Sequence, residues 1–302
     1  MAATTKTVYI GSTQVAPEIL NSDVVTNGVY RNLSEIDWGD APTEFYEQAR
    51  PFLDGVILRG SHVGPRDFMW KLISRVNVPT VSNVEAVRDD ELEQLLDYLS
   101  PDRGVLTLKQ SRVDAAGGAI SRVIYAAPKA LPAWKWSPHD IDDGFVGSHE
   151  GNFLVLPIAW RAHFPWFIDE ADSNGTDMTI NGTTMDTDSI TNNGIIGCGL
   201  RISITGSGTG DVTIANTTSG ESITLNNIVL HASNAHVVDY HVADPLNRDA
   251  YRSSTPTTKI WNTISAGGFL GLDRGANTIT VVSEAGVSGT VTFRYRQFWG
   301  AP

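Results

Sequence analysis

The hydrophobic and polar positions of this chain follow a helical period in only one convincing stretch, between Glu85 and Leu99. Four leucines there recur at the i, i+3, i+4, i+7 spacing that lines one face of a helix: Leu92, Leu95, Leu96 and Leu99. Asp89 or Asp90 is the predicted N-terminal cap, and Ser100-Pro101 ends the helix because proline cannot continue it. The pattern predicts an amphipathic helix that covers one face of a sheet.

Elsewhere in the first half the pattern alternates with the two-residue period of a β-strand. In residues 68–76, Phe68, Trp70 and Leu72 fall on one face, and Met69, Lys71 and Ile73 fall on the other. Further strands are predicted at residues 55–60, 105–110, 119–127 and 153–161. The run Ala115-Ala116-Gly117-Gly118 predicts a hairpin between two of them. The first 60 residues otherwise show few clear periods, and we expect them to be irregular.

The amino-acid composition of the chain changes near residue 170. From Asp169 onwards it is rich in Thr, Ser, Asn and Gly, with short β-branched runs between turns. The predicted strands are residues 200–205, 211–215, 222–225, 237–242, 278–282 and 290–296. Many short strands at close spacing favour an antiparallel β-sandwich.

We therefore predict an α+β domain over residues 1–168, followed by an all-β sandwich over residues 169–302. The final strand, residues 290–299, either completes the sandwich or returns to the first domain. A length of 302 residues is typical of two domains.

Charge and cysteine content narrow the functional class. The net charge is −12, with 22 basic residues outweighed by 34 acidic ones. A nucleic-acid partner is therefore not expected, because phosphate binding needs clustered Lys and Arg. The single cysteine, Cys198, lies in an apolar run and is expected to be a buried core thiol. We predict no signal peptide and no membrane span, hence a protein made in the cytoplasm.

Candidate catalytic patterns are weak. An acidic cluster in a Gly-rich stretch could bind metal or act as a general acid, although a solvated loop is the simpler reading: Asp140, Asp142, Asp143, His149 and Glu150. Asp186 and Asp188 lack the remaining ligands of a calcium loop and suit a turn. The histidines His231, His236 and His241 fit no metal spacing. A glycosidase carboxylate pair stays open, because it needs only spatial proximity. We predict no catalytic residue, metal or cofactor.

Aromatic residues are the more suggestive candidates. A group of them precedes the change of composition: Trp134, Trp136, Trp160, Phe164, Trp166 and Phe167. Exposed aromatic side chains stack on sugars or form subunit contacts, whereas buried ones would make a core at the domain junction. The candidate interface or glycan-facing residues are Trp134, Trp136, Trp166 and Trp261.

Several short motifs, in a fixed order from about residue 54 to the end, resemble the distal tail proteins of siphophages. In the first half these are residues 54–58, the helix with the following residues 100–108, the strand at 120–125, and Phe164-Pro165-Trp166. In the second half they are residues 202–206, 212–220, 222–225, 271–280 and 291–299. Residues 1–53 and 128–150 have no counterpart.

The resemblance implies a non-enzymatic virion protein of the tail tip, assembled in the host bacterial cytoplasm. Its N-terminal domain would form a homo-hexameric ring that joins the tail tube protein to the tail-hub protein and supports baseplate assembly. The C-terminal domain would be a galectin-like or carbohydrate-module-like sandwich, with an adhesin or a host glycan as a further partner. The alternative function is a carbohydrate-binding tail module that contacts host cell-wall glycan.

Overall fold

The computed structural model describes residues 7–11, 18–19, 22–26, 29–49, 56–76, 84–100, 102, 104–113, 118–130, 135–136, 153–182, 185–240, 248–254 and 257–301. The chain forms two compact units. Unit 1 comprises Met1–Phe167 together with Gly300–Pro302, and unit 2 comprises Ile168–Trp299. Unit 2 is therefore inserted in unit 1 along the sequence.

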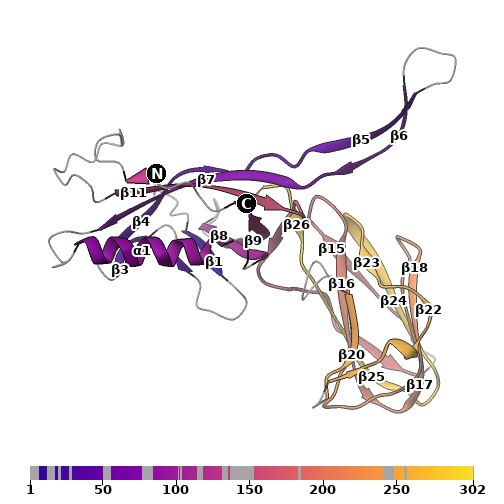
Figure 1. Ribbon diagram of the computed structural model, residues 1–302. Coiled ribbons are helices and arrows are strands. Elements are labelled where there is room, and N and C mark those ends of the chain that lie inside the picture. The colour runs from indigo at the N-terminus through magenta and orange to yellow at the C-terminus, as the bar shows by residue number, and fades with distance from the viewer. Residues whose placement is uncertain are drawn as a thin grey trace. The chain divides into compact units, whose positions relative to one another are not determined.

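Unit 1 is built on an antiparallel sheet (Figure 1). Its strands are β1 (Thr7–Gly11), β2 (Glu18–Ile19), β3 (Ser22–Thr26), β4 (Val29–Asp37), β7 (Arg66–Val76), β8 (Leu106–Val113), β9 (Ala119–Pro128), β10 (Lys135–Trp136) and β11 (Phe153–Ala162). They follow the order β2-β1-β8-β9-β11-β7-β4-β3, and β10 pairs with β11. The predicted hairpin is confirmed, because β8 pairs with β9 from Leu106↔Ala126 to Val113↔Ala119.

The prediction that the first 60 residues are irregular is wrong. Strands β1, β3 and β4 lie there, and β4 pairs with β7 while β1 pairs with β8. These partners come from far along the chain and supply the backbone hydrogen bonds that a strand needs. A weak local period was therefore no sign of irregular structure.

The core of unit 1 follows the alternation predicted for β7. Trp70 and Leu72 are fully buried, whereas Met69 on the opposite face is 55% exposed. Ile73 is also buried, so the sheet is covered on both faces at that point. An aromatic cluster forms around Trp70, whose ring centroid lies 5.1 Å from that of Trp38 and 5.2 Å from that of Trp160.

The predicted helix is present as α1 (Val84–Tyr98), which lies along the sheet in Figure 1. Leu95 and Leu99 are fully buried, and Glu91 accepts a 2.8 Å hydrogen bond from the Ser74 hydroxyl of β7. The predicted cap is wrong, because the helix begins at Val84 and both Asp89 and Asp90 are exposed inside it.

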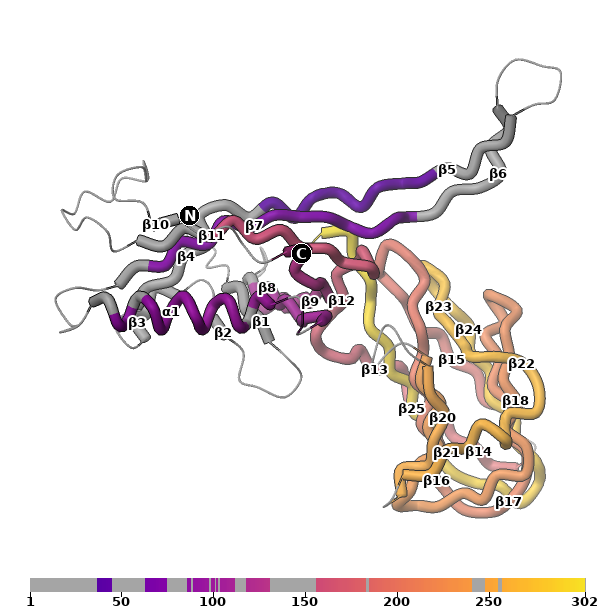
Figure 2. The backbone as a smooth tube through the Cα atoms, viewed as in Figure 1, coloured from indigo at the N-terminus to yellow at the C-terminus, as the bar shows by residue number. Residues whose placement is uncertain are grey.

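A separate hairpin, β5 (Thr43–Ala49) and β6 (Val56–Val63), continues from β4 and leads into β7 (Figure 2). Among the described strands, β5 and β6 pair only with each other. The passage from β4 to β5 requires Gly39, which has a φ of +54°; a Cβ there would lie 2.2 Å from the Asp67 carbonyl oxygen. The Gly64 amide donates to the Pro42 carbonyl oxygen at 2.7 Å and holds the base of the hairpin.

Unit 2 is an antiparallel sandwich, which confirms the predicted fold class. One sheet has the order β13-β25-β16-β19-β20-β21, with β14 beside β25 and β23 beside β16; the other has the order β15-β24-β17-β18-β22. The strands are β13 (Ser173–Asn174), β14 (Met178–Asn181), β15 (Asp186–Asn192), β16 (Cys198–Ser207), β17 (Thr209–Asn216), β18 (Glu221–Val229), β19 (His236–Tyr240), β20 (Arg248–Arg252), β21 (Thr258–Lys259), β22 (Ile264–Gly267), β23 (Gly271–Leu272), β24 (Gly275–Ser283) and β25 (Ser288–Tyr295). Strand β25 pairs with β16 along its whole length, inside unit 2.

Alternate positions of these strands fill the sandwich core. The buried side chains of the two sheets include Leu200, Ile202, Ile204, Val291 and Phe293 from one sheet, and Val212, Ile214, Ile223, Leu225, Ile279 and Val281 from the other. Each strand predicted within the described part of this unit overlaps an observed strand, because the β-branched runs mark inward positions.

Three fully buried asparagines hold the loops of the sandwich: Asn192, Asn216 and Asn277. The Asn216 side-chain amide donates to the Gly271 carbonyl oxygen at 2.9 Å and to Asn277 Oδ1 at 3.0 Å. Asn277 in turn donates to the Asp273 and Gly275 carbonyl oxygens. The loop before β24 is therefore fixed from inside the fold.

Candidate functional site

The four aromatic candidates from the sequence do not form one site. Trp134 and the side chain of Trp136 lie outside the described residues. Trp166 is half-buried in unit 1, between β11 and β12 (Phe167–Asp169). Trp261 lies in unit 2 and is 42% exposed.

Two aromatic residues near Trp166 belong to the core of unit 1. Trp160 and Phe167 are fully buried. The Phe167 ring centroid lies 5.1 Å from that of Trp38, and the Arg66 guanidinium lies 5.1 Å from the same ring. Their burial leaves neither ring free to contact a ligand.

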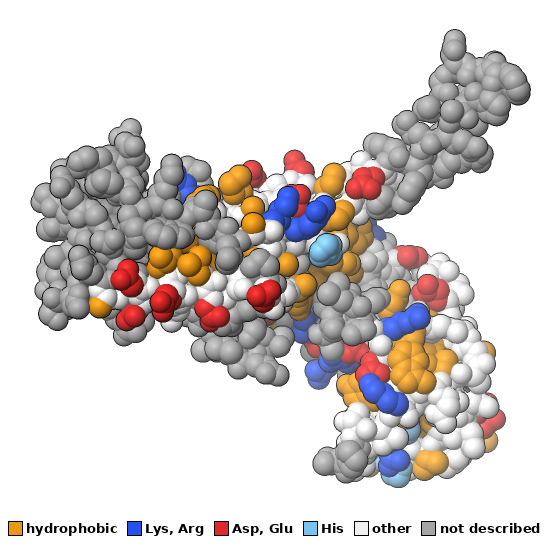
Figure 3. Space-filling view, in the orientation of Figure 1, with side chains coloured by type: hydrophobic (Ala, Val, Ile, Leu, Met, Phe, Trp, Pro, Cys, Tyr) orange, Lys and Arg blue, Asp and Glu red, His pale blue; other side chains and the backbone are white. Residues whose placement is uncertain are grey.

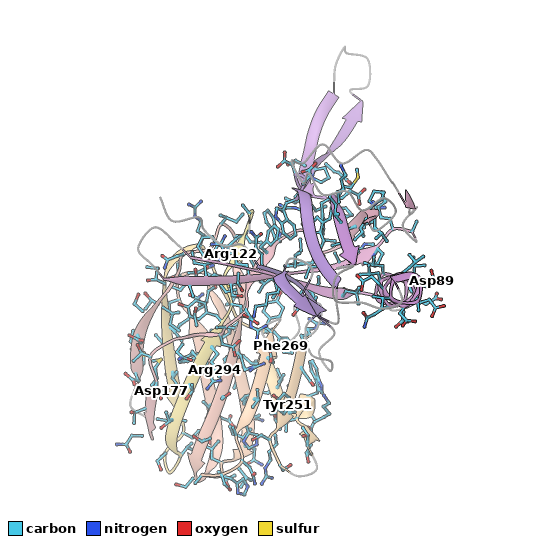
Figure 4. The ribbon with its side chains drawn as sticks, turned by 90° about the vertical axis from the view of Figure 1, so that its left-hand side faces the viewer. Asp89, Arg122, Asp177, Tyr251, Phe269 and Arg294 are labelled. Carbon is cyan, nitrogen blue, oxygen red and sulfur yellow. The ribbon has the colours of Figure 1, made fainter. Side chains whose placement is uncertain are left out.

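Trp261 is part of a row of three aromatic rings on the sandwich, which we call the aromatic row: Tyr240, Phe269 and Trp261. Tyr240 ends β19, Phe269 lies between β22 and β23, and Trp261 opens a short 3-10 helix, η3 (Trp261–Thr263). The ring centroids of Tyr240 and Phe269 are 5.7 Å apart, and those of Phe269 and Trp261 are 5.3 Å apart. Phe269 is labelled in Figure 4.

A buried residue anchors the turn that carries Trp261. None of the residues of η3 is buried, but the preceding Ile260 is 6% exposed. The Ile260 amide donates to the Ala250 carbonyl oxygen at 3.0 Å, and the Ile260 carbonyl oxygen accepts from the amide and hydroxyl of Thr263. Trp261 is thus displayed on an ordered turn, next to a core residue.

Two charged side chains lie close to members of the aromatic row or to the backbone beside it. The Arg248 guanidinium lies 5.5 Å from the Phe269 ring centroid. Glu221 accepts a 3.1 Å hydrogen bond from the Gly271 amide. A Cβ built on Gly271 would lie 3.8 Å from Glu221 Oε2 and 3.9 Å from Tyr240 Cε1, so the carboxylate and the phenol ring flank the same glycine. Hydrophobic and basic side chains also gather on the sandwich in Figure 3.

Sequence reasoning identified Trp261 but missed the other members of this site. Tyr240, Arg248 and Phe269 are separated along the chain and share no period. Only Phe269 could have been suspected from the sequence. It directly follows Ala266-Gly267-Gly268, a run typical of a turn, and a large aromatic residue beside a turn is a candidate for an exposed contact.

The weak catalytic candidates do not gather in the described part of the chain. The acidic cluster from Asp140 to Glu150 lies outside it, as does His241. The Asp186 carboxylate accepts hydrogen bonds from the Thr179 and Thr187 amides, so it stabilises the β14–β15 connection. Within the described residues, no three His, Cys, Asp or Glu side chains come together to hold a metal.

Cys198 is buried, as predicted. Burial, followed by the nearby Asp169 carboxylate, raises the pKa of its thiol to about 12. The thiol is therefore protonated at neutral pH and is a poor nucleophile, since the thiolate is the reactive form.

His236 is also buried, on the inner side of β19. Burial lowers the pKa of its imidazole, and the positive charges of Arg252 and His231 lower it further.

In the described portion of the chain, no helix combines the length and apolar character of a membrane span.

Comparison with known proteins gives a match in structure only. No family model matches the sequence, and no curated protein does. The fold is similar to that of the phage SPP1 Dit protein, described as a paradigm of the hub adsorption apparatus in phages that infect Gram-positive bacteria. The TM-score is 0.63 at 12% sequence identity, covering 97% of this chain and 99% of that one. A chain of the phage P2 baseplate in its activated conformation aligns with a TM-score of 0.48 at 9% identity, over 97% of this chain and 98% of that chain.

The SPP1 comparison extends over both units of the chain. A sandwich alone would be weak support, because unrelated proteins share that architecture. The resemblance to distal tail proteins seen in the sequence is therefore confirmed at the level of the fold, which is similar to that of the phage SPP1 Dit protein.

Proposed function

We propose that this protein is a non-enzymatic structural component of a phage tail tip, with unit 1 closing into a hexameric ring. The ring would join the tail tube to the tail-hub proteins and serve as the platform on which the baseplate assembles. The observation that carries this proposal is the fold similarity to the SPP1 hub protein over nearly the full length of both chains.

The hairpin β5–β6 supports assembly into a ring. Its strands pair only with each other among the described strands, and an isolated two-stranded hairpin is marginally stable in water. Its outer edges offer backbone donors and acceptors to a strand of a neighbouring subunit. A head-to-tail contact of this kind closes into a ring when the rotation between subunits permits.

The environments of the reactive side chains support a structural role. The Cys198 thiol is protonated and buried, and the Asp186 carboxylate is engaged by backbone amides. These groups stabilise the fold, which is what a scaffold protein requires.

The oligomeric mass of the full chain tests the proposal. Light scattering should give six copies, and negative-stain images should show a ring with a central hole. Thr43 and Val63 are cross-strand partners, so a short Gly-Ser turn can join Glu44 to His62 in place of residues 45–61. That variant should stay folded but fail to form the ring.

A full chain that remains monomeric over its soluble concentration range would contradict the ring. If the shortened variant still forms hexamers, the hairpin is not part of the contact between subunits, although the protein does form a ring.

A further inference from the structure

We propose that the end of the sandwich at which β19 begins and β20 ends holds a phosphate-binding site, formed by Arg252, His236 and His231. We call these three residues the basic cluster. All three belong to unit 2, so the proposal goes beyond the role in a tail tip and does not depend on ring formation.

Strand pairing brings two members of the basic cluster together. His236, the first residue of β19, pairs with Arg252, the last residue of β20, and on its other side with Ile204 of β16. Cross-strand partners in an antiparallel sheet have their side chains on the same face. Because Ile204 is fully buried in the core, His236 and Arg252 also face the inside of the sandwich, where their strands end. Tyr251, the neighbour of Arg252 in β20, is labelled in Figure 4.

Buried polar atoms of this pair have no partner within the described residues. His236 is only 4% exposed, and its Nδ1 atom is buried without a hydrogen bond, as is the Nε atom of Arg252. The Arg201 guanidinium of the same sheet, by contrast, forms ion pairs with Asp172 at 3.5 Å and with Asp239 at 2.7 Å. A partly buried guanidinium without a counter-charge destabilises a fold, so an anion that supplies the charge is favoured.

The chain segments around the pair are poor in carboxylates. Residues 230–235, which precede β19, and residues 253–257, which follow β20, contain no Asp or Glu. Glu284 follows β24 in the opposite sheet, and its carboxylate accepts a hydrogen bond from the Asp211 amide at 3.0 Å. The positive charge of Arg252 is therefore not neutralised by these segments.

The third member of the cluster adds to this positive charge. The pKa of the His236 imidazole is lowered by burial and then by the positive charges of Arg252 and His231, so both groups lie close to it. Figure 3 shows histidine side chains beside a Lys or Arg side chain at the lower end of the sandwich. In a chain with a net charge of −12, the basic cluster is a local positive site.

The cluster is open on one side. Arg252 and His231 are half-buried, and the Gly206 amide donates to the His231 carbonyl oxygen at 3.2 Å, which fixes the backbone there. A small anion can reach the pair between these two side chains, and a larger ligand can present only a terminal group.

The donors select phosphate over other ligands. A guanidinium binds an oxyanion through two parallel N–H groups, and each imidazole supplies a further N–H donor. A phosphate has enough acceptor oxygens for all three side chains, whereas a carboxylate has only two. A metal cation would be repelled by Arg252, whose guanidinium stays charged.

Phosphorus-31 NMR of inorganic phosphate added to the full chain tests this site at neutral pH and constant ionic strength. The phosphate resonance should broaden in a saturable manner, and acetate should compete at least about tenfold more weakly. Methyl phosphate distinguishes free phosphate from a terminal phosphate group as the natural ligand. If methyl phosphate competes, the site admits an ester; if only inorganic phosphate binds, the site is specific for the free ion, and either result supports it.

Two arginine variants separate specific binding from general charge. Arg252→Gln should weaken phosphate binding by about tenfold or more, because it removes the bidentate donor. The matched control is Arg294→Gln, which removes the same charge from an exposed position in β25 of the same sheet and is labelled in Figure 4. Its phosphate affinity should stay within about twofold of that of the original chain.

Thermal unfolding guards against a folding defect. Without phosphate, Arg252→Gln should be at least as stable as the original chain, since it removes an unpaired charge. Phosphate should raise the Tm of the original chain and of Arg294→Gln, but not that of Arg252→Gln. His236→Gln is a second binding variant and should weaken phosphate binding by about threefold or more.

The proposal is overturned if phosphate shows no saturable broadening, or if acetate competes as well as phosphate does. It is also overturned if Arg252→Gln and Arg294→Gln lose affinity equally, or if His236→Gln binds phosphate as the original chain does. Oligomeric mass is read separately by light scattering, so the phosphate site and the ring can each fail alone.

Discussion

At the residue scale, buried asparagines explain part of the motif pattern that suggested the family. Asn216 and Asn277 both lie in segments that resemble distal tail proteins, and both are fully buried. They bind each other and the carbonyl oxygens of Gly271, Asp273 and Gly275. The motifs thus encode a hydrogen-bond network that shapes loops, and no catalytic chemistry is needed to account for them.

A matched pair of neighbours tests this role of asparagine. Asn192 donates to the Ile196 carbonyl oxygen at 2.9 Å and accepts from the Gly194 amide at 2.9 Å, whereas Asn193 is exposed. Asn192→Ala should lower the free energy of unfolding by about 2–4 kcal/mol, because buried backbone groups lose their partners. Asn193→Ala should change it by less than about 0.5 kcal/mol. Urea unfolding followed by circular dichroism gives both values, and equal effects would refute the assignment.

His236 makes the stability of unit 2 depend on pH. Its pKa is lowered in the folded state, so the unfolded chain binds the proton more readily. The stabilisation is complete above the ordinary histidine pKa of about 6.5 and is lost as the pH falls through the folded value. The opening free energy of β16 and β19, measured by native-state hydrogen exchange, should therefore decrease below about pH 6.5, by at most about 1.4 kcal/mol per pH unit for one proton.

Two histidine variants, one buried and one exposed, test whether His236 causes this pH dependence. His236→Gln should remove this contribution to the pH dependence, while His163→Gln, an exposed position in unit 1, should leave it in place. An unchanged pH profile in His236→Gln would show that other groups cause the effect.

At the element scale, α1 shows which part of a helix signal is reliable. The leucine spacing predicted the buried face, since Leu95 and Leu99 are fully buried. The start of the helix was mispredicted, because Asp is favourable both as a cap and as an exposed residue of an early turn. Pairing of Ser74 with Glu91 shows that contact with β7 helps to hold the helix in place.

Two neighbouring leucines of α1 provide the corresponding test. Leu95→Ala should lower the free energy of unfolding of unit 1 by about 2–5 kcal/mol, because it leaves a cavity in the core. Leu96 is half-buried, so Leu96→Ala should cost clearly less. Urea unfolding followed by the fluorescence of the buried Trp70 and Trp160 reports on this unit. Equal losses would mean that the helix packs with another face.

At the scale of the whole molecule, charge and connectivity bear on assembly. The chain enters unit 2 after Phe167 and re-enters unit 1 at Gly300. Two buried arginines of unit 1 hold the returning segment: Arg66 donates to the Gly300 carbonyl oxygen at 2.7 Å, and Arg122 donates to that of Ala301 at 2.6 Å. The returning segment is therefore tied into unit 1 by hydrogen bonds as well as by the chain.

The net charge of −12 opposes the association of copies. Added salt screens this repulsion over a Debye length of about 10 Å at 0.1 M ionic strength. The proposed hexamer should therefore become more populated as salt rises from about 20 to about 200 mM, at constant protein concentration. Light scattering over a salt series measures the population. Dissociation on adding salt would show that ion pairs dominate the contact instead.

The elements whose hydrophobic pattern is local were predictable from the order of the amino acids alone. The leucine stripe of α1, the alternation in β7, the β8–β9 hairpin and the short strands of the sandwich are repeated at short range, where side-chain periodicity reflects one buried face. These local patterns were enough to predict the fold class and a sandwich in the second half of the chain. The apolar run around Cys198 was enough to predict that its thiol is buried.

Features that depend on partners far apart along the chain become visible only in the folded protein. Strands β1 and β4 form because β8 and β7 offer edges for pairing, and β3 pairs with β4 in turn. The start of α1 lies where no cap was identified in the sequence. The aromatic row likewise joins Tyr240, Phe269 and Trp261 from three separate elements. No local period can encode such a meeting, because the contacts arise when the two sheets of the sandwich pack and bring their connecting segments together.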